Sequence, residues 1–237
     1  MSLPPIAVLA GGLASRLQPI SLTVPKWLAR VNGEPFCAIQ LRQLKAQGFD
    51  RVVLLIGVMG DQIRQEVGDG DRFGLSVSYL EDGPEPLGTG GPVARARPRL
   101  GPLFFVTYGD TLLRYDPRAV VKVLKRTGAA AAMVVLRNDG RWDRSNVVLE
   151  GDYVARYSKG SADRSGMRWI DYGATLFTDA AFADVGDGPF DLAAVLERLS
   201  QERRLVAHEV HERFYEIGTP AALAETERYL AAQGDVG

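Results

Sequence analysis

Short apolar runs alternate along the first half of the chain with segments whose apolar residues recur every three or four positions. Strands are predicted where apolar and β-branched residues run together or alternate with polar ones, at 6–10, 52–56, 75–80 and 103–108. Helices are predicted where the helical spacing ends at glycine or begins at a cap, at 36–47, 61–67, 90–100 and 117–126. Strands that alternate with helices predict a parallel or mostly parallel sheet covered by helices.

The second half is less regular. Strands are predicted at 130–136, 146–149, 153–157 and 169–177, and helices at 192–202 and 221–232. Residues 137–168 are richer in Arg, Asp, Gly and Ser, which fits either a loop-rich subdomain over a site or a plain solvated loop. The chain has no internal repeat, no low-complexity tract and no linker, so we expect one domain over residues 1–237.

Composition narrows the class of protein. The chain has 237 residues, 46% of them hydrophobic and 24% charged, which is typical of a globular domain. Its 28 basic and 29 acidic residues give a net charge of −1, so neither nucleic acid nor an anionic membrane is an expected partner. Cys37 is the single cysteine and cannot form an internal disulfide. No apolar stretch is long enough for a membrane span, and the first residues lack the pattern of a signal peptide, so a cytoplasmic location is expected.

The loop after the first predicted strand carries the most informative chemistry. Gly11 and Gly12 directly follow the apolar run, so backbone N–H groups there can approach an anion without an intervening Cβ. Arg16 can give forked hydrogen bonds to phosphate oxygens, and Lys26 adds a point charge. These features predict a polyphosphate pocket. The dinucleotide glycine spacing and the Gly-Lys-Ser/Thr motif are both absent, which argues against a dehydrogenase and a Walker-type ATPase.

The segment from Leu9 through Arg16 to Lys26 resembles the signature of the sugar-1-phosphate nucleotidyltransferases, also called nucleoside-diphosphate-sugar pyrophosphorylases. Ala14 stands where that family has glycine, and Ser15 where threonine is commoner. The resemblance implies a Rossmann-like, three-layer α/β/α fold with a mostly parallel mixed sheet, of the nucleotide-diphospho-sugar transferase type. It also implies that Leu9, Ala10, Gly11 and Gly12 bind the nucleotide.

A second glycine-rich segment, residues 86–91, resembles the loop that holds the nucleotide base in this family. The resemblance implies nucleotide binding by Leu87, Gly88 and Thr89, with the glycines packing closely against a flat base. Glu81 lies a few residues earlier and can accept hydrogen bonds from a base with adjacent N–H donors, as guanine has. An exposed Glu81 with no such role is the alternative.

Two further motifs suggest a magnesium site. Asp110 follows Tyr108 and Gly109 at the end of a predicted strand, where the family has Asn-Gly-Asp, and a carboxylate facing phosphates suits Mg²⁺. The segment 214–220 resembles the closing motif Asp-x-Gly-Thr-Pro, which makes Glu216 the second metal ligand by resemblance, one methylene longer than the usual aspartate. Thr219 and Pro220 are also expected to begin the last helix as N-cap and first residue.

The sugar side is inferred from the resemblance alone. Lys159 stands in a segment where relatives carry Glu-Lys-Pro, whose lysine meets the sugar phosphate. Asp171 and Gly173 stand where many relatives have Asn-Ala-Gly, which contacts sugar hydroxyls, and a carboxylate can accept such hydroxyl hydrogen bonds. Gly109 is assigned to the same group. The nucleotide-binding half is expected at 1–136 and the sugar-phosphate-binding half at 137–237.

The resemblance implies Mg²⁺-dependent transfer of a nucleotidyl group from a nucleoside triphosphate to a sugar 1-phosphate, with Arg16, Lys26 and Asp110 in the catalytic roles. The chain most resembles small single-domain members of the family, among them the heptose- and mannose-1-phosphate guanylyltransferases, and the small uridylyltransferases that act on N-acetylmuramate 1-phosphate resemble it too; GTP is the expected donor. The product would be a nucleotide sugar, of the kind used in polysaccharide biosynthesis. Two alternatives stay open: a uridylyltransferase acting on a hexosamine- or muramate-type 1-phosphate, and a non-catalytic nucleotide-sugar-binding homologue. Family members are often oligomers, which leaves a homo-oligomer open.

Overall fold

One sheet contains strands from the whole length of the chain. The computed structural model describes residues 2–12, 24–83, 86–186 and 188–234. Within those residues the main sheet has nine strands, ordered β5-β4-β1-β6-β11-β8-β12-β10-β9. Their bounds are β1 (Ile6–Leu9), β4 (Arg51–Ile56), β5 (Ser76–Glu81), β6 (Leu103–Tyr108), β8 (Ala131–Arg137), β9 (Val147–Glu150), β10 (Tyr153–Tyr157), β11 (Trp169–Thr178) and β12 (Leu205–Val210). Two short pairs lie outside this sheet, namely β2 (Arg30–Val31) with β3 (Glu34–Pro35), and β7 (Thr111–Leu112) with β13 (Tyr215–Glu216).

The helices begin and end close to where the sequence predicts. They are α1 (Phe36–Ala46), α2 (Gly60–Val67), α3 (Gly90–Leu100), α4 (Pro117–Thr127), α5 (Leu192–Gln201) and α6 (Pro220–Ala232), with short 3₁₀ turns η2 (Lys26–Leu28), η3 (Asp71–Phe73) and η4 (Asp179–Phe182). Asp116 caps α4 by accepting from the N–H of Arg118 at 2.9 Å. Thr219 caps α6 by accepting from the N–H of Ala222 at 3.2 Å, with proline as the first residue of the helix.

Strand direction divides the sheet. β5, β4, β1 and β6 run parallel, with Ile6 paired to Val52 on one side and Phe105 on the other. β11 runs antiparallel to both β6 and β8, and β10 runs antiparallel to β12 and β9. β12 and β8 are again parallel. The sheet is therefore mixed but mostly parallel, as predicted.

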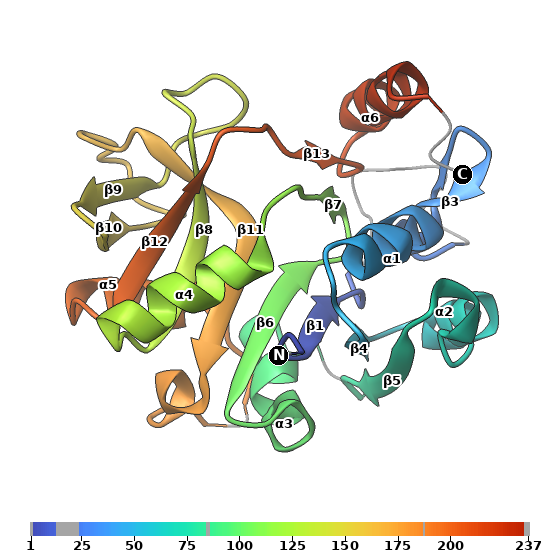
Figure 1. Cartoon of the computed structure of the whole chain (residues 1–237), viewed down its shortest axis with the longest axis horizontal. Helices are drawn as coiled ribbons and strands as arrows, with labels where there is room; N and C mark the ends of the chain where they lie inside the picture. The colour runs from blue at the N-terminus through green and yellow to red at the C-terminus, as the bar shows by residue number, and fades with distance from the viewer. Residues whose placement is uncertain (1, 13–23, 84–85, 187, 235–237) are drawn as a thin grey trace.

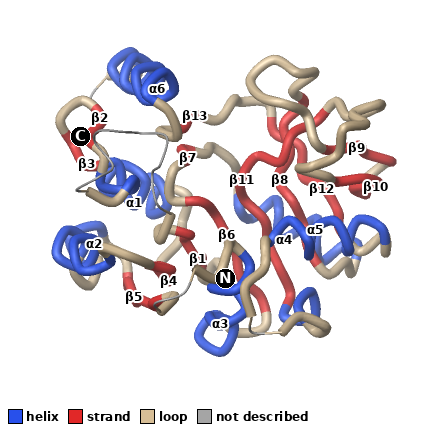
Figure 2. The backbone as a smooth tube through the Cα atoms, turned by 180° about the vertical axis from the view of Figure 1, so that it is seen from behind, coloured by secondary structure: helices blue, strands red, loops and turns tan. Residues whose placement is uncertain are grey.

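Apolar side chains on the two faces of the sheet form separate cores. On one face, α1, α2 and α4 bury residues such as Leu41, Ile63 and Val120. On the other face, α3 and α5 bury residues such as Val93 and Leu196. Figure 1 shows α4 crossing in front of β8 and β12, and Figure 2 shows the same sheet from behind. Helices on both faces of a sheet give the predicted three-layer α/β/α architecture.

The elements that the sequence did not predict are mostly short. The pairs β2–β3 and β7–β13 have two residues in each strand, too few for a period-two pattern to be recognised. Within the part of the chain that the structure describes, no helix has the length and apolar character needed to cross a membrane.

Candidate functional site

A cavity of about 400 Å³ lies at the carboxyl ends of β1, β4 and β6. In open α/β sheets, ligands bind at this edge, and the volume suits a small-molecule ligand. The lining comes from five parts of the chain: Leu9, Ala10, Gly11 and Gly12; Lys26 and Trp27; Leu55, Gly57 and Val58; Asp82, Gly83, Pro86, Leu87, Gly88, Thr89 and Pro92; and Tyr108, Gly109 and Asp110. The structure therefore gathers most of the predicted nucleotide-binding residues around one cavity. Arg16 lies outside the described residues.

Close backbone packing explains why glycine follows β1. A Cβ built on Gly11 would lie 2.8 Å from the backbone nitrogen of Gly57, which follows β4. A side chain at position 11 would push these neighbouring loops apart and displace the cavity wall that they form. A Cβ on Gly12 meets nothing within 4 Å, so the space beside it is open. The two glycines thus serve different purposes: the first lets the loops meet, and the second leaves the backbone accessible.

Lys26 and Asp110 line one end of the cavity, and Glu216, which is not a lining residue, lies close to Lys26. The Lys26 ammonium donates to Asp110 Oδ2 at 2.5 Å. The ideal Cβ position on Gly218 lies 3.4 Å from Lys26 Nζ and 3.5 Å from each Glu216 carboxylate oxygen, so all three atoms surround one point. Pairing of β7 with β13 sets this arrangement, since Thr111 is opposite Glu216 and the N–H of Ile217 donates to the Asp110 carbonyl at 3.0 Å.

A buried glutamine, which the sequence analysis missed, holds the Lys26 and Asp110 segments together. Gln40 of α1 accepts from the indole N–H of Trp27 at 2.7 Å, next to Lys26. Its amide nitrogen donates to the backbone carbonyls of Tyr108 and Thr111 at 2.8 and 2.7 Å, on either side of Asp110. Because all these partners are backbone or buried groups, the network fixes both charged residues at the cavity wall. The signal in the sequence that could have indicated this network is Gln40 itself, a polar residue on the apolar face of the helix predicted at 36–47.

The predicted sugar-side residues lie beyond Tyr108, which lines the cavity. The ammonium of Lys159 lies 3.4 Å from the Tyr108 hydroxyl oxygen. Asp171 accepts from the Tyr157 hydroxyl at 3.3 Å and from the N–H of Gly173 at 2.9 Å. A register shift in β11 after Asp171 and a φ of +96° at Gly173 mark a bulge at this point. Burial raises the pKa of Asp171 above its ordinary value.

Of the two neighbouring acidic residues Glu81 and Asp82, Asp82 is the one that lines the cavity. Glu81 is not among the lining residues; it points outward, and its carboxylate pairs with Arg64 at 2.6 Å. Asp82 lines the cavity, and its Oδ1 is buried with no hydrogen-bond partner among the described residues. Burial raises the pKa of Asp82 to about 6, although the neighbouring Arg95 lowers it. Successive side chains along a strand point in opposite directions, and the outward position of Glu81 agrees with the alternative that it has no role in base binding.

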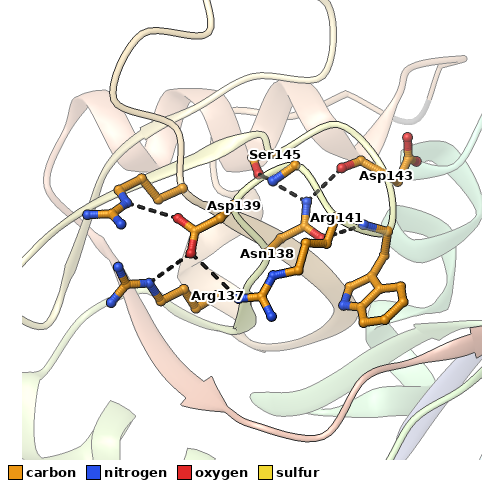
Figure 3. Close-up of polar contacts among 9 residues, drawn as sticks. Arg137, Asn138, Asp139, Arg141, Asp143 and Ser145 are labelled. Carbon is orange, nitrogen blue, oxygen red and sulfur yellow. Dashed lines mark hydrogen bonds and ion pairs between the residues drawn. The ribbon is translucent and has the colours of Figure 1, made fainter.

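Residues 137–168 form an ordered turn and a hairpin rather than a plain loop, and none of them lines the described cavity. Figure 3 shows the buried Asn138, whose amide nitrogen donates to the Asp143 carbonyl and to the Ser145 hydroxyl oxygen at 2.6 and 3.0 Å. Asp139 pairs with Arg137 at 3.2 Å and Arg141 at 3.7 Å, and with a third arginine from the segment before β11. The segment contributes Lys159 near the cavity and otherwise extends the far edge of the sheet.

A comparison with protein families identifies the group to which this architecture belongs. The model of the MobA-like NTP transferase domain matches residues 6–210, which include the cavity lining. The chain belongs to this family. The match confirms the resemblance read from the segment between Leu9 and Lys26.

The curated relatives of this chain include a guanylyltransferase and a uridylyltransferase, whose names give two different nucleotide bases. The mannose-1-phosphate guanylyltransferase catalytic subunit beta of Xenopus tropicalis is 27% identical over 220 residues, which are 90% of this chain and 61% of that protein. The N-acetylmuramate alpha-1-phosphate uridylyltransferase of Neisseria meningitidis is 38% identical over 113 residues, which are 46% of this chain and 48% of that protein. The match thus covers 61% of the length of the first relative and 48% of the length of the second.

Solved structures share the fold. HddC from Yersinia pseudotuberculosis, known alone and complexed with GMP-PN, superposes with TM-scores of 0.79 and 0.78 at 22% identity. Each alignment covers 96% of this chain and 100% of the other. The inositol-1-phosphate CTP transferase from T. maritima gives a TM-score of 0.78 at 18% identity and covers 98% of that chain. These likenesses confirm the predicted nucleotidyltransferase fold.

Proposed function

We propose that the chain transfers a nucleotidyl group from a nucleoside triphosphate to a sugar 1-phosphate. The observation that carries the proposal is the ion pair of Lys26 and Asp110 at one end of a cavity on the carboxyl edge of parallel strands, with the Glu216 carboxylate close to Lys26. A cation and carboxylates at this edge suit a polyphosphate and its metal ion. Family membership supports the same reaction class.

The reaction needs positioning and charge stabilisation more than proton transfer. A phosphate oxygen of the sugar 1-phosphate attacks the α-phosphorus and forms the new P–O bond. The bond from the α-phosphorus to the bridging oxygen breaks, and pyrophosphate leaves with the electron pair. Because the attacking oxygen is already anionic, no general base is required. The protein has to bring two polyanions together and stabilise the added charge.

Three basic residues divide this task in the proposal. Lys26 contacts the α-phosphate. Gln40 holds the Lys26 segment in place, because it accepts from Trp27 and donates to the Tyr108 carbonyl. Lys159, beside Tyr108 at the far side of the cavity, guides the sugar phosphate. Arg16, in the same loop as Gly11 and Gly12, is assigned to the triphosphate and the departing pyrophosphate by the family resemblance.

The donor atoms of Asp110 and Glu216 fit Mg²⁺. This ion prefers oxygen ligands, takes few of them from the protein and leaves positions for water and substrate phosphates. Asp110 lines the cavity and Glu216 lies close to its partner Lys26, and the described residues contain no group of three or more acidic, histidine or cysteine side chains that could form a closed metal cage. Mg²⁺ bound there would neutralise charge on the phosphates and on the leaving pyrophosphate.

Guanine is the base that the cavity suits best. Guanine offers two adjacent donors, N1–H and the 2-amino group, and an ionised carboxylate offers two acceptors. The buried, unpartnered Oδ1 of Asp82 provides an acceptor at the base-binding end. The guanylyltransferase relative agrees with this choice, and we propose mannose or heptose 1-phosphate as the acceptor. Uracil has a single N–H donor between two carbonyls, so the uridylyltransferase alternative leaves one Asp82 oxygen unpaired.

Pyrophosphate release is the direct test. Purified protein is incubated with Mg²⁺, each of the four ribonucleoside triphosphates or dTTP, and each of mannose, heptose, glucose and N-acetylmuramate 1-phosphates. We expect release with GTP and mannose or heptose 1-phosphate, and none from a Lys26→Ala variant prepared in parallel. Release with UTP and N-acetylmuramate 1-phosphate instead would support the uridylyltransferase. Nucleotide binding without release under any combination would support the non-catalytic homologue.

A further inference from the structure

The nucleotide loop, residues 86–91, is built against a segment about a hundred residues later in the chain. The N–H of Phe190 donates to the Leu87 carbonyl at 3.1 Å, and the N–H of Gly90 donates to the Phe190 carbonyl at 2.9 Å. These two backbone hydrogen bonds hold the loop against the residues that lead into α5. The shape of the cavity wall at Leu87 to Thr89 therefore depends on where this segment lies.

Close packing on Phe190 requires glycine at two positions of the loop. Gly88 has a φ of +70°, and a Cβ on it would lie 2.4 Å from the Phe190 carbonyl oxygen. A Cβ on Gly90 would lie 2.0 Å from the Phe190 ring. Both contacts are shorter than any real Cβ can make, so the glycines let the two segments meet. Packing of the same glycines against a flat base stays a prediction.

A shared set of hydrogen bonds joins the loop to the start of α5. Asp191 is the N-cap of α5, and its Oδ1 accepts from the N–H of Ala193 at 2.9 Å. The same Oδ1 accepts from the hydroxyl of Thr89 at 2.9 Å. The Thr89 oxygen in turn accepts from the N–H of Leu192 at 2.9 Å. One side chain of the cavity wall thus takes part in capping a helix.

The Asp191 carboxylate is held by Ala193 and Thr89, and the charge of Lys159 also acts on it. Burial opposes its ionisation, but hydrogen bonds from Ala193 and Thr89, with the charge of Lys159, outweigh burial and lower its pKa. Its carboxylate is not among the residues that line the cavity. It can therefore act on the loop that does line the cavity without touching a substrate.

We propose that Asp191 is a positioning residue that holds the nucleotide loop in its binding geometry through Thr89. The kinetic part of this inference rests on the proposed nucleotidyl transfer, whereas the ordering of the loop does not. Asp191 acts on the triphosphate side, so its loss raises KM for the nucleotide and leaves KM for the sugar 1-phosphate and kcat largely unchanged.

The test compares Asp191→Ala with two matched variants. Asp191→Asn keeps an acceptor oxygen for both Ala193 and Thr89, and asparagine is an equally good N-cap. Asp116→Ala removes the corresponding N-cap of α4, which has no bond to the loop. We expect Asp191→Ala to raise KM for the triphosphate roughly tenfold, from the loss of one or two hydrogen bonds. Asp191→Asn and Asp116→Ala should stay within about twofold of the wild type, although Asp116→Ala loses a similar helix cap.

Hydrogen exchange gives a second readout that needs no substrate. The amide of Gly90 is protected by its bond to Phe190, so its exchange should accelerate in Asp191→Ala and not in Asp116→Ala. Unchanged exchange at residues 86–91 in Asp191→Ala would overturn the inference. So would equal changes in both KM values and kcat, or an equal nucleotide effect in Asp116→Ala. If the wild type transfers no nucleotide, the proposed function fails, and the exchange result alone decides the positioning role.

Discussion

Replacing Asp82 by asparagine tests whether this chain binds guanine or uracil, the two bases named for its relatives. The substitution keeps the shape of the side chain and exchanges one acceptor oxygen for an NH₂ donor. In the wild type, Asp82 lines the cavity and its buried Oδ1 has no hydrogen-bond partner among the described residues, so the carboxylate has unused acceptor capacity beside the cavity. Inosine triphosphate is the matched substrate because it lacks only the 2-amino group of GTP.

The expected magnitude follows from one charge-assisted hydrogen bond. Such bonds contribute about 1.5–3 kcal/mol, or roughly 10- to 150-fold in kcat/KM. The wild type should therefore prefer GTP over inosine triphosphate by that factor. In Asp82→Asn the preference should fall to within about threefold, because the NH₂ group now faces another donor. The kcat/KM for GTP itself should fall roughly a hundredfold.

Steady-state kinetics with GTP and inosine triphosphate, on the wild type and on two variants, complete the experiment. Glu81→Gln is the control, since Glu81 is the adjacent carboxylate but pairs with Arg64 outside the cavity. Its GTP preference should match the wild type within about twofold, as for an exposed ion pair. If Asp82→Asn keeps the wild-type ratio, Asp82 does not read the 2-amino group, and the assignment of guanine to this carboxylate is wrong.

Four other outcomes are expected. The preference for GTP over inosine triphosphate should fall as the pH is lowered through about 6. Burial raises the pKa of Asp82 to about 6, although the charge of Arg95 opposes this shift, and the protonated carboxyl has one acceptor fewer for guanine. Because this pKa is raised on folding, the ionised carboxylate opposes folding above about pH 6, so Asp82→Asn should melt at a higher temperature than the wild type at about pH 7.5 and lose that advantage in acid. EDTA should abolish turnover, and Glu216→Gln should raise the Mg²⁺ concentration for half-maximal activity several-fold, whereas an unchanged Mg²⁺ titration would remove Glu216 from the metal site. Arg16→Ala should lower turnover by orders of magnitude with an unchanged circular dichroism spectrum, and near-normal turnover would contradict its assigned role.

Local signals were enough to predict most of the fold. Apolar runs marked β1, β4 and β6 because these strands are largely buried on both faces, whereas β12 was not predicted. Helix boundaries followed from caps such as Asp116 and Thr219. The motifs also led to Lys26 and Asp110, since each follows a strand or loop whose end lies at the same edge of the sheet. The sequence therefore predicts those features, such as strands, helix caps and motif residues, that depend on a pattern within a few residues.

The remaining features depend on contacts between distant segments. Glu81 and Asp82 are both acidic, and which one faces the cavity depends on where β5 ends: the N–H of Asp82 still donates to Ile56 of β4. A shift of one residue reverses the side chain, and composition does not indicate that shift. The packing of Gly90 on Phe190 and the bonds of Gln40 likewise join segments far apart in the sequence.

The position of β11 limits how this protein can respond to its substrates. This strand is hydrogen-bonded to β6 along one edge and to β8 along the other, so it joins the side of the sheet that bears the cavity to the side that carries β10 and, after it, Lys159. A hinge rotation between these two sides would break main-chain hydrogen bonds in the middle of the sheet, at a free-energy cost that binding of small ligands rarely repays. We therefore expect ligand-induced movement in the segments that connect the strands and not in the sheet itself. The distance between the proposed nucleotide site and the proposed sugar-phosphate site is then set when the chain folds.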